Sequence, residues 1–176
     1  MKLLIVVDYQ NDFVDGSLGF PGAELLDEKI AEKIELYHEN GDKVIFTMDT
    51  HSKDYLGTQE GKNLPVEHCI KGTDGHKLYG KTALAFREGD MIFEKPTFPS
   101  LELANYLKDK PFDNVEIVGL VSNICVISNA IMVKSALPEA IITVDAACTD
   151  SFDKEMNKKC LDVMQGLQIK VIGGKL

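Results

Sequence analysis

Short apolar runs, separated by segments of helix length, recur along the whole chain and constrain its fold more than any other feature. Six such runs are rich in aliphatic and β-branched residues: Lys2–Val7, Lys43–Met48, Met91–Phe93, Val115–Gly119, Ala140–Val144 and Gln168–Ile172. Segments with helical spacing of apolar residues lie between them, at Ala23–Asn40, at Leu101–Leu107, from Ile124 onward and at Lys154–Gln165. This alternation predicts an α/β fold of three layers, α/β/α and Rossmann-like, with a mostly parallel central sheet. A length of 176 residues suits a single domain over residues 1–176.

A polar or reactive side chain stands at or just beyond the end of four of these predicted strands. The four residues are Asp8, Asp49, Lys95 and Cys125. Ligands of parallel α/β sheets bind beyond the carboxyl ends of the strands, so we expect these side chains to converge at one edge. Each of them taken alone could be an ordinary polar residue at a strand end. Together they offer a base, a cation and a nucleophile.

Cys125 lies where the predicted strand Val115–Gly119 passes into a helix. The turn is predicted at Leu120–Asn123, with Ser122 or Asn123 capping the helix. Cys125 would then sit in the first helical turn, where free amides and the helix dipole favour an anion, so the thiol should ionise more readily. The same amides could hold the oxyanion formed when a thiolate attacks a carbonyl. The competing interpretation is a small buried residue, because free cysteine is among the most buried residue types.

Asp8, Lys95 and Cys125 allow a division of chemical labour. Asp8 would accept the thiol proton, Lys95 would keep Asp8 ionised and stabilise developing charge, and the thiolate would attack an amide carbonyl. Whether the three side chains meet depends on the geometry of the fold.

A second constellation has the nitrogen and oxygen ligands that suit zinc or another divalent transition metal. It consists of Asp49, His51, Glu60 and His68. In an extended segment, Asp49 and His51 point to the same side and can bind as a unit. Residues 50–88 form an irregular polar stretch of 39 residues that holds three of the four histidines, and so long a loop in a compact domain is usually functional or disordered.

Charge and cysteine content exclude several other classes of protein. A net charge of −9 without a basic run argues against a nucleic-acid partner. No apolar stretch approaches the ~20 residues of a membrane span, and the start MKLLIVVDYQND does not fit a signal peptide, so we expect a cytoplasmic protein. Four cysteines without a CxxC pair favour free thiols over a disulfide framework.

Five segments together carry a resemblance to a known family. They are VVDYQNDF at 6–13, TMDTHSKDY at 47–55, LPVEHCIKGTDG at 64–75, EKPTFPS at 94–100 and GLVSNICVISNA at 119–130. In their order and spacing the chain resembles the isochorismatase-like cysteine hydrolases, and within them the nicotinamidase/pyrazinamidase group, over nearly its whole length.

The resemblance implies roles for particular residues. It places Asp8, Lys95 and Cys125 on the catalytic triad and implies a non-proline cis peptide before Val121, with the amides of Val121 and Cys125 forming the oxyanion hole. The metal ligands it implies are Asp49, His51 and His68. Phe13 falls on an aromatic residue that lines the pocket for a planar ring.

The chain departs from the family pattern at one metal ligand and in its lack of tryptophan. Many members carry another histidine shortly after the DxH motif, where this chain has LGTQEGK, and Glu60 is our candidate for that ligand, with Tyr55 or a water as the fallback. A ring-stacking tryptophan of some members must be replaced or absent, because the chain contains none.

The expected function is a metal-dependent cysteine amidohydrolase that converts nicotinamide to nicotinate and ammonia through a thioester. Zinc is the first expectation for the metal, with iron or manganese as alternatives. A small-molecule amide is the expected partner, and self-association into a homo-oligomer is suggested by analogy alone. The nearest alternative is another amidase of the superfamily acting on a carbamoyl or ureido compound. Alternatives of a different class are a phospho-receiver domain centred on Asp49 and a non-enzymatic metal-binding module.

Overall fold

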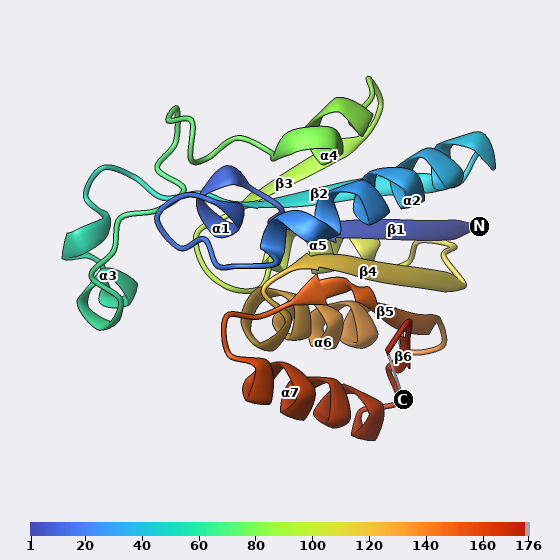
Figure 1. Ribbon diagram of the computed structural model, residues 1–176. Coiled ribbons are helices and arrows are strands. Elements are labelled where there is room, and N and C mark those ends of the chain that lie inside the picture. Colours follow the sequence, from blue (N-terminus) through green and yellow to red (C-terminus); the bar gives the residue numbers. More distant parts are fainter. Residues whose placement is uncertain (175–176) are drawn as a thin grey trace.

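The computed structural model describes residues 1–174, and a parallel sheet forms its centre (Figure 1). Within that part of the chain the sheet has six strands in the order β3-β2-β1-β4-β5-β6, and each adjacent pair is parallel. The strands are β1 (Lys2–Val7), β2 (Lys43–Asp49), β3 (Met91–Lys95), β4 (Asn114–Leu120), β5 (Ile141–Asp150) and β6 (Lys170–Ile172). The prediction of an α/β fold with a parallel sheet is confirmed. Residues 175 and 176 of the predicted domain lie outside the described residues.

Strand β1 lies near the middle of the sheet and is buried on both faces. Leu3, Ile5 and Val7 belong to one apolar core, whereas Leu4 and Val6 belong to the other. All five side chains are fully buried. The uninterrupted apolar run in the sequence therefore reflects a strand that has a layer of helices on each side.

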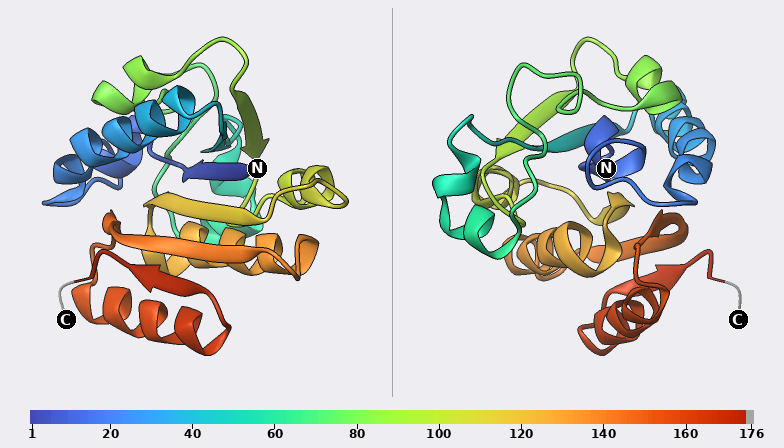
Figure 2. Two further views of the ribbon diagram at one scale, coloured as in Figure 1. Left: turned by 90° about the vertical axis from the view of Figure 1, so that its right-hand side faces the viewer. Right: turned by 60° about the vertical axis from the view of Figure 1, so that its left-hand side comes forward.

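The helices form the two outer layers. Helices α2 (Asp27–Glu39) and α4 (Gly80–Ala85) cover the face that holds Leu4 and Val6. Helices α5 (Leu101–Leu107), α6 (Ile127–Ala136) and α7 (Lys154–Gly166) cover the opposite face. Two short helices, α1 (Asn11–Val14) and α3 (Gln59–Asn63), lie at the end of the sheet opposite the N-terminus, as Figures 1 and 2 show.

The segment over residues 50–88 contains more regular structure than we predicted. In place of one long irregular stretch it contains α3, α4 and a 3-10 turn at Tyr55–Gly57. Helix α3 has five residues and is capped by Thr58, whose hydroxyl accepts from the amide of Gly61 at 3.0 Å. Isolated helices this short are unstable in water, so tertiary packing decides whether they form.

Two further boundaries differ from the predictions. The predicted helix Ala23–Asn40 begins with a 3-10 turn, Ala23–Leu26, before α2. Strand β5 runs to Asp150, beyond the predicted end at Val144, and its pairing with β4 shifts register between Ile117 and Gly119. Asp145 therefore lies within β5, where its carboxylate is 2.9 Å from Lys33 Nζ.

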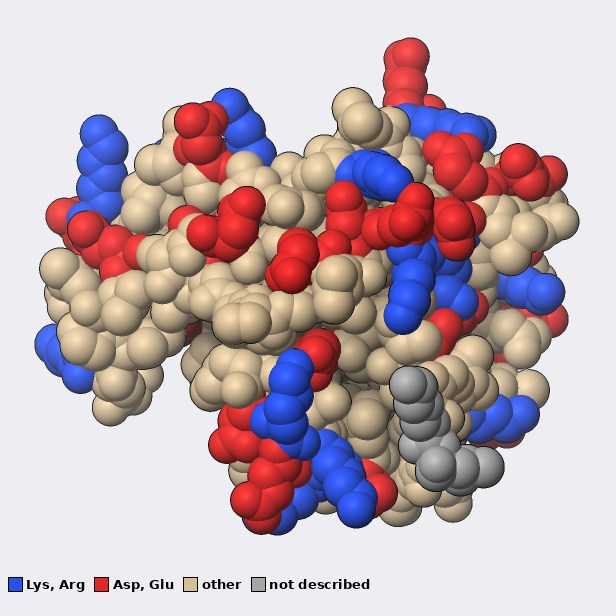
Figure 3. Space-filling model, viewed as in Figure 1, with Lys and Arg blue, Asp and Glu red and all other residues tan. Residues whose placement is uncertain are grey.

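Charged side chains of both signs are interspersed on the face of the molecule seen in Figure 3, where carboxylates are prominent. This matches the excess of 28 acidic over 19 basic residues in the sequence. Among the described residues, no helix combines the length and apolar character that crossing a membrane would require.

Candidate active site

The carboxyl ends of four adjacent strands bring Asp8, Asp49, Lys95 and Cys125 together, as predicted. Asp8 follows β1, Asp49 and Lys95 are paired in register at the ends of β2 and β3, and Cys125 lies in the turn after β4. Lys95 Nζ is 2.6 Å from Asp8 Oδ2, 3.4 Å from Asp49 Oδ1 and 3.6 Å from Cys125 Sγ. The ammonium group therefore lies between two carboxylates and the thiol.

The close approach of β1 and β4 at this edge depends on Gly119. Its φ is +111°, and a Cβ there would lie 2.0 Å from the carbonyl oxygen of Val7. Asp8 itself adopts a φ of +47°, a left-handed conformation that aspartate tolerates better than most residues. Thr47, which sequence reasoning did not single out, donates a hydrogen bond of 2.6 Å to Asp8 Oδ1 and fixes the carboxylate.

Burial dominates the electrostatics of Asp8 and Lys95. Burial raises the pKa of Asp8 even though Lys95 opposes the shift. Burial alone would lower the pKa of Lys95, but the facing carboxylates and thiol outweigh it and raise that pKa above its ordinary value. Lys95 therefore stays protonated, and Asp8 has a greater affinity for a proton than an exposed carboxylate.

The expectation that Cys125 ionises readily is wrong for this structure. Burial raises the pKa of the Cys125 thiol, Lys95 opposes that rise, and the negative charges of Asp8 and Asp49 add to it. The thiol is therefore a poor acid until a neighbouring group accepts its proton. Asp8 is a candidate for that group, because its carboxylate and the thiol both approach Lys95 Nζ, at 2.6 and 3.6 Å.

The turn after β4 also differs from the predicted helix start. Ser122–Val126 form a π-helical turn that precedes α6, and the residue at the cap position is Val121, without a side-chain hydrogen bond. Neither Ser122 nor Asn123 caps the helix, and Cys125 lies before α6, not in its first turn. The expected cis peptide between Leu120 and Val121 is present. Asn129, which sequence reasoning missed, holds the turn by donating to the carbonyl oxygen of Cys125 at 2.8 Å.

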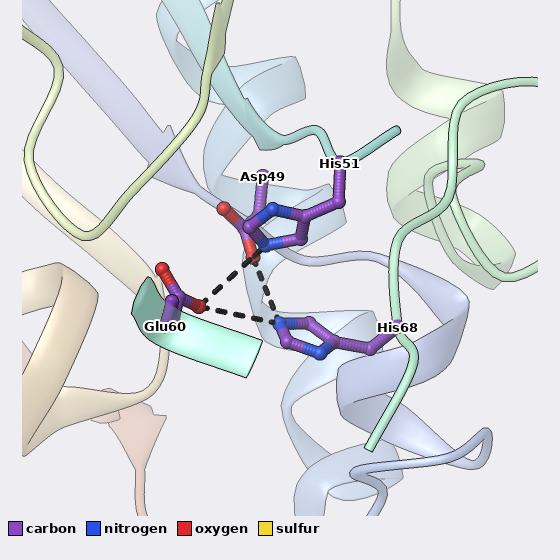
Figure 4. A group of neighbouring side chains, drawn as sticks. All are labelled: Asp49, His51, Glu60 and His68. Carbon is purple, nitrogen blue, oxygen red and sulfur yellow. Dashed lines mark hydrogen bonds and ion pairs between the residues drawn. The ribbon is translucent and has the colours of Figure 1, made fainter. Parts of the chain in front are cut away.

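A group of possible metal ligands lies next to these residues (Figure 4). The ligand atoms of Asp49, His51, Glu60 and His68 all lie within 4.8 Å of one another, and the four side chains point toward a common centre. Asp49 Oδ2 is 3.0 Å from His51 Nε2 and 3.2 Å from His68 Nε2. The prediction that Asp49 and His51 point the same way is confirmed.

Glu60 reaches the group from helix α3. Its Oε1 is 3.6 Å from His51 Nε2 and 3.8 Å from His68 Nε2. Tyr55, the fallback candidate, turns its hydroxyl away and donates to the carbonyl oxygen of Leu64 at 2.9 Å. Its ring packs against both imidazoles, at centroid distances of 4.6 and 4.9 Å.

The donor atoms of this group fit a divalent metal. His68 Nδ1 is 2.8 Å from the carbonyl oxygen of Val66, so that nitrogen carries the proton and Nε2 faces the centre. Burial raises the pKa of Asp49, but the facing imidazoles of His51 and His68, together with Lys95, outweigh burial and lower it, so the carboxylate is ionised. Two imidazoles and two carboxylates suit zinc, iron or manganese. Asp49 is thus engaged by two imidazoles and Lys95, an arrangement that a phospho-receiver does not require.

One cavity of about 450 Å³ joins the thiol to the possible metal ligands. Cys125 lines it together with Asp49, Glu60 and His68. Phe13 lines it as predicted and packs against the ring of His68 at a centroid distance of 5.6 Å. The remaining wall is mainly apolar and includes Val121 together with residues to which sequence reasoning gave no role: Ser17, Leu18, Gly19, Leu64, Phe98, Ile124 and Phe152. Such a cavity suits a flat, uncharged ring.

Two residues of the VVDYQNDF segment hold the surrounding loops. Gln10 is fully buried, and its amide donates to the carbonyl oxygen of Asp49 at 2.9 Å and accepts from the amide of Asp49 at 2.8 Å. Asp12 accepts from the amide of Cys69 at 2.7 Å. Their polarity immediately after a buried strand was the available signal, but it could not identify their partners.

Comparisons with known proteins agree with this geometry. The isochorismatase domain family matches residues 2–174. A nicotinamidase from Saccharomyces cerevisiae is 26% identical over 215 residues, which covers 98% of this chain and 99% of the relative. The crystal structure of a pyrazinamidase/nicotinamidase from Streptococcus mutans superposes with a TM-score of 0.87 at 28% identity, covering 98% of this chain and 100% of that one. A pyrazinamidase of Pyrococcus horikoshii, solved in complex with zinc, has the same fold, with a TM-score of 0.84 at 24% identity and coverage of 98% and 99%.

Proposed function

This chain belongs to the isochorismatase family, and from that premise we propose that it is a metal-dependent cysteine amidohydrolase that converts nicotinamide to nicotinate and ammonia. The observation that carries the proposal is the placement of Cys125 within 3.6 Å of Lys95, which is itself 2.6 Å from Asp8. All three are buried, and Cys125 lines a mainly apolar cavity whose wall includes possible metal ligands. The names of the S. cerevisiae and S. mutans proteins support nicotinamide as the substrate.

In the first half of the reaction, Cys125 forms a thioester with the substrate. Asp8 accepts the thiol proton as Sγ attacks the amide carbonyl, which removes the obstacle that burial places on thiol ionisation. We propose that the amides of Val121 and Cys125 stabilise the oxyanion. The tetrahedral intermediate then collapses, the C–N bond breaks, and the proton held by Asp8 passes to the nitrogen, so that ammonia leaves.

In the second half, water cleaves the thioester. Asp8, again ionised, accepts a proton from the attacking water, the C–S bond breaks, and the proton returns to the sulfur of Cys125. Lys95 remains protonated throughout and balances the negative charge that alternates between Asp8 and the reacting atoms.

We propose Asp49, His51, Glu60 and His68 as the metal ligands and zinc as the metal. The zinc in the P. horikoshii protein supports this choice, together with the two imidazoles of the group. When bound, the ion would supply a positive charge that could attract the lone pair of a ring nitrogen in the substrate. Phe13 would hold the ring by stacking, so that the carboxamide faces Cys125.

An ammonia-release assay on metal-replete protein tests the proposal. Nicotinamide should be hydrolysed, and Cys125→Ala should abolish turnover while the metal content stays unchanged. Activity near that of the unaltered protein in Cys125→Ala would show that the nucleophile is assigned wrongly. Faster ammonia release from carbamoyl or ureido amides than from nicotinamide would show that the substrate is assigned wrongly.

Two expectations from the sequence stay predictions. Self-association into a homo-oligomer can be measured by light scattering, and a cytoplasmic location by cell fractionation.

A further inference from the structure

Asp12, which takes no part in the proposed reaction, holds the segment that carries His68. Its Oδ2 accepts a hydrogen bond of 2.7 Å from the amide of Cys69, and its Oδ1 accepts one of 3.2 Å from the amide of Ser17. Asp12 lies in α1, directly before Phe13. It therefore links the cavity wall near Ser17 to the residue that follows His68.

Cys69 is also the point at which the segment is joined to His51. The carbonyl oxygen of Cys69 accepts from the amide of His51 at 3.0 Å, and the amide of Lys71 donates to the carbonyl oxygen of His51 at 2.9 Å. Cys69 has a φ of +47°, a left-handed conformation that is unfavourable for a residue with a side chain and persists only when neighbouring groups hold it. The hydrogen bond from the Cys69 amide to Asp12 therefore constrains the backbone next to His68 and, through the Cys69 carbonyl, the backbone of His51.

Two glycines fix the position of the Asp12 carboxylate. A Cβ on Gly75 would lie 2.1 Å from Asp12 Oδ2, and a Cβ on Gly16 would lie 2.4 Å from Oδ1. The carboxylate occupies space that a side chain at either position would fill. Its placement is therefore determined by packing as well as by the two amides that it accepts from.

We propose that Asp12 is a positioning residue of the metal site. By holding the amide of Cys69, it keeps His51 and His68 directed toward Asp49 and Glu60, the arrangement seen in Figure 4. The inference rests on the proposed role of these four residues as metal ligands. Groups that orient metal-binding histidines from behind typically change metal affinity by about 10–100-fold when they are replaced. Asp12 acts on two histidines at once through the backbone, so we expect an effect in that range.

The test is a titration of the metal-free full-length chain with cobalt(II), followed by visible absorption. Cobalt reports its coordination geometry in its spectrum, so the titration yields both a dissociation constant and a spectroscopic signature. In Asp12→Asn the single amide oxygen cannot replace both carboxylate oxygens, and its NH₂ would face a backbone donor. The dissociation constant should rise about 10–100-fold and the absorption bands should shift.

Two further variants make the result decisive. Gly75→Ala retains the carboxylate but displaces it, and it should weaken cobalt binding in the same direction. Asp74→Asn removes the same charge from an exposed side chain of the same loop, which pairs only with the exposed Lys77 among the described residues, and it should leave affinity and spectrum unchanged. If Asp12→Asn does not fold, as judged by circular dichroism, Gly75→Ala alone decides the question.

A dissociation constant within twofold of the unaltered protein, with an unchanged spectrum, in either Asp12→Asn or Gly75→Ala would overturn the role of Asp12. A variant that melts earlier without metal yet keeps its cobalt spectrum and affinity would also overturn it, because Asp12 would then serve stability alone. If the unaltered chain binds no cobalt, the metal site itself fails, and this inference fails with it.

Discussion

Replacing Lys95 with methionine should destabilise the protein severely, because the change leaves two buried carboxylates without their cation. Lys95 is 1% exposed, its Nζ lies 2.6 Å from Asp8 and 3.4 Å from Asp49, and Asp8 is fully buried. Methionine has a similar shape to lysine, so the loss of stability reports mainly the removal of the positive charge and only slightly a change in packing. Removing one partner of a buried ion pair typically costs about 3–5 kcal/mol in the free energy of unfolding. With a urea dependence of about 2 kcal/mol per molar, the unfolding midpoint should fall by about 2 M.

The loss should depend on pH in a defined direction. The pKa of Asp8 is raised in the folded protein by burial, and Lys95 opposes that rise, so its removal raises the pKa further. A carboxyl group whose folded pKa is raised binds more protons in the folded state, and its destabilising effect therefore grows as pH rises through that window. The difference in stability between Lys95→Met and the unaltered protein should be larger at about pH 8 than at about pH 5.

Urea unfolding of metal-free protein at both pH values, followed by circular dichroism, measures this difference. The matched control is the double variant Asp8→Asn/Lys95→Met, which removes both charges and should recover a large part of the loss. Lys95→Met and the double variant should both lack amidase activity. The double variant would therefore regain stability without regaining catalysis. A loss below about 1 kcal/mol, or one that the double variant does not reduce, would refute the view that a buried ion pair organises this site.

Three shorter predictions follow from other parts of the site. Glu60→Ala should lower the amount of metal bound per chain, measured by elemental analysis after dialysis. The control is Gln59→Ala, which changes an exposed neighbour and should leave the metal content unchanged. Equal metal content in the two variants would remove Glu60 from the ligands. Gly119→Ala should lower the free energy of unfolding by more than about 2 kcal/mol, because its φ of +111° and the nearby β1 backbone leave no room for a side chain. Gly166→Ala is the control, because a Cβ there would meet no atom within 4 Å. Equal urea midpoints for the two variants would contradict the argument. The kcat/KM for nicotinamide should fall on the acid side with a midpoint above the ordinary aspartate pKa of about 3.9, because burial raises the pKa of Asp8 and the proposed base must be ionised; a profile that stays flat to about pH 4 would exclude Asp8 as that base.

The fold and the convergence of the site were predictable because both follow from regular features of the sequence. Apolar runs mark strands such as β1, and parallel strands must bring their carboxyl ends to one edge, which places Asp8, Asp49 and Lys95 together without knowledge of any contact. The Asp-x-His spacing placed His51 by the same kind of rule. The catalytic and metal-binding roles rested on the family resemblance as well.

The rest depends on tertiary contacts that periodicity does not encode. Helix α3, which carries Glu60, has five residues, so no pattern of apolar residues announces it. The π-helical turn before α6 cannot be distinguished from an α-helical start by spacing alone. The pKa of Cys125 depends on how deeply the fold buries the thiol, and a helix-dipole argument from sequence omits that larger effect.

Burial of the cysteines has a practical consequence for counting functional molecules in a preparation. The thiols of Cys69, Cys125, Cys148 and Cys160 are all buried and free, yet of these four side chains Cys125 is the one that lines the cavity. Cys148 lines a separate pocket beside Lys33 and Asp145, where burial and the nearby carboxylate raise the pKa of its thiol. A flat aromatic electrophile that fits the active-site cavity should therefore alkylate Cys125 first, and a Cys125→Ala chain should lose that first mass increment. Alkylation requires the Cys125 thiol to lose its proton to Asp8. The number of labelled chains would therefore count the molecules in which Asp8 and Cys125 are correctly placed, and chains in which they lie apart would not be labelled at Cys125.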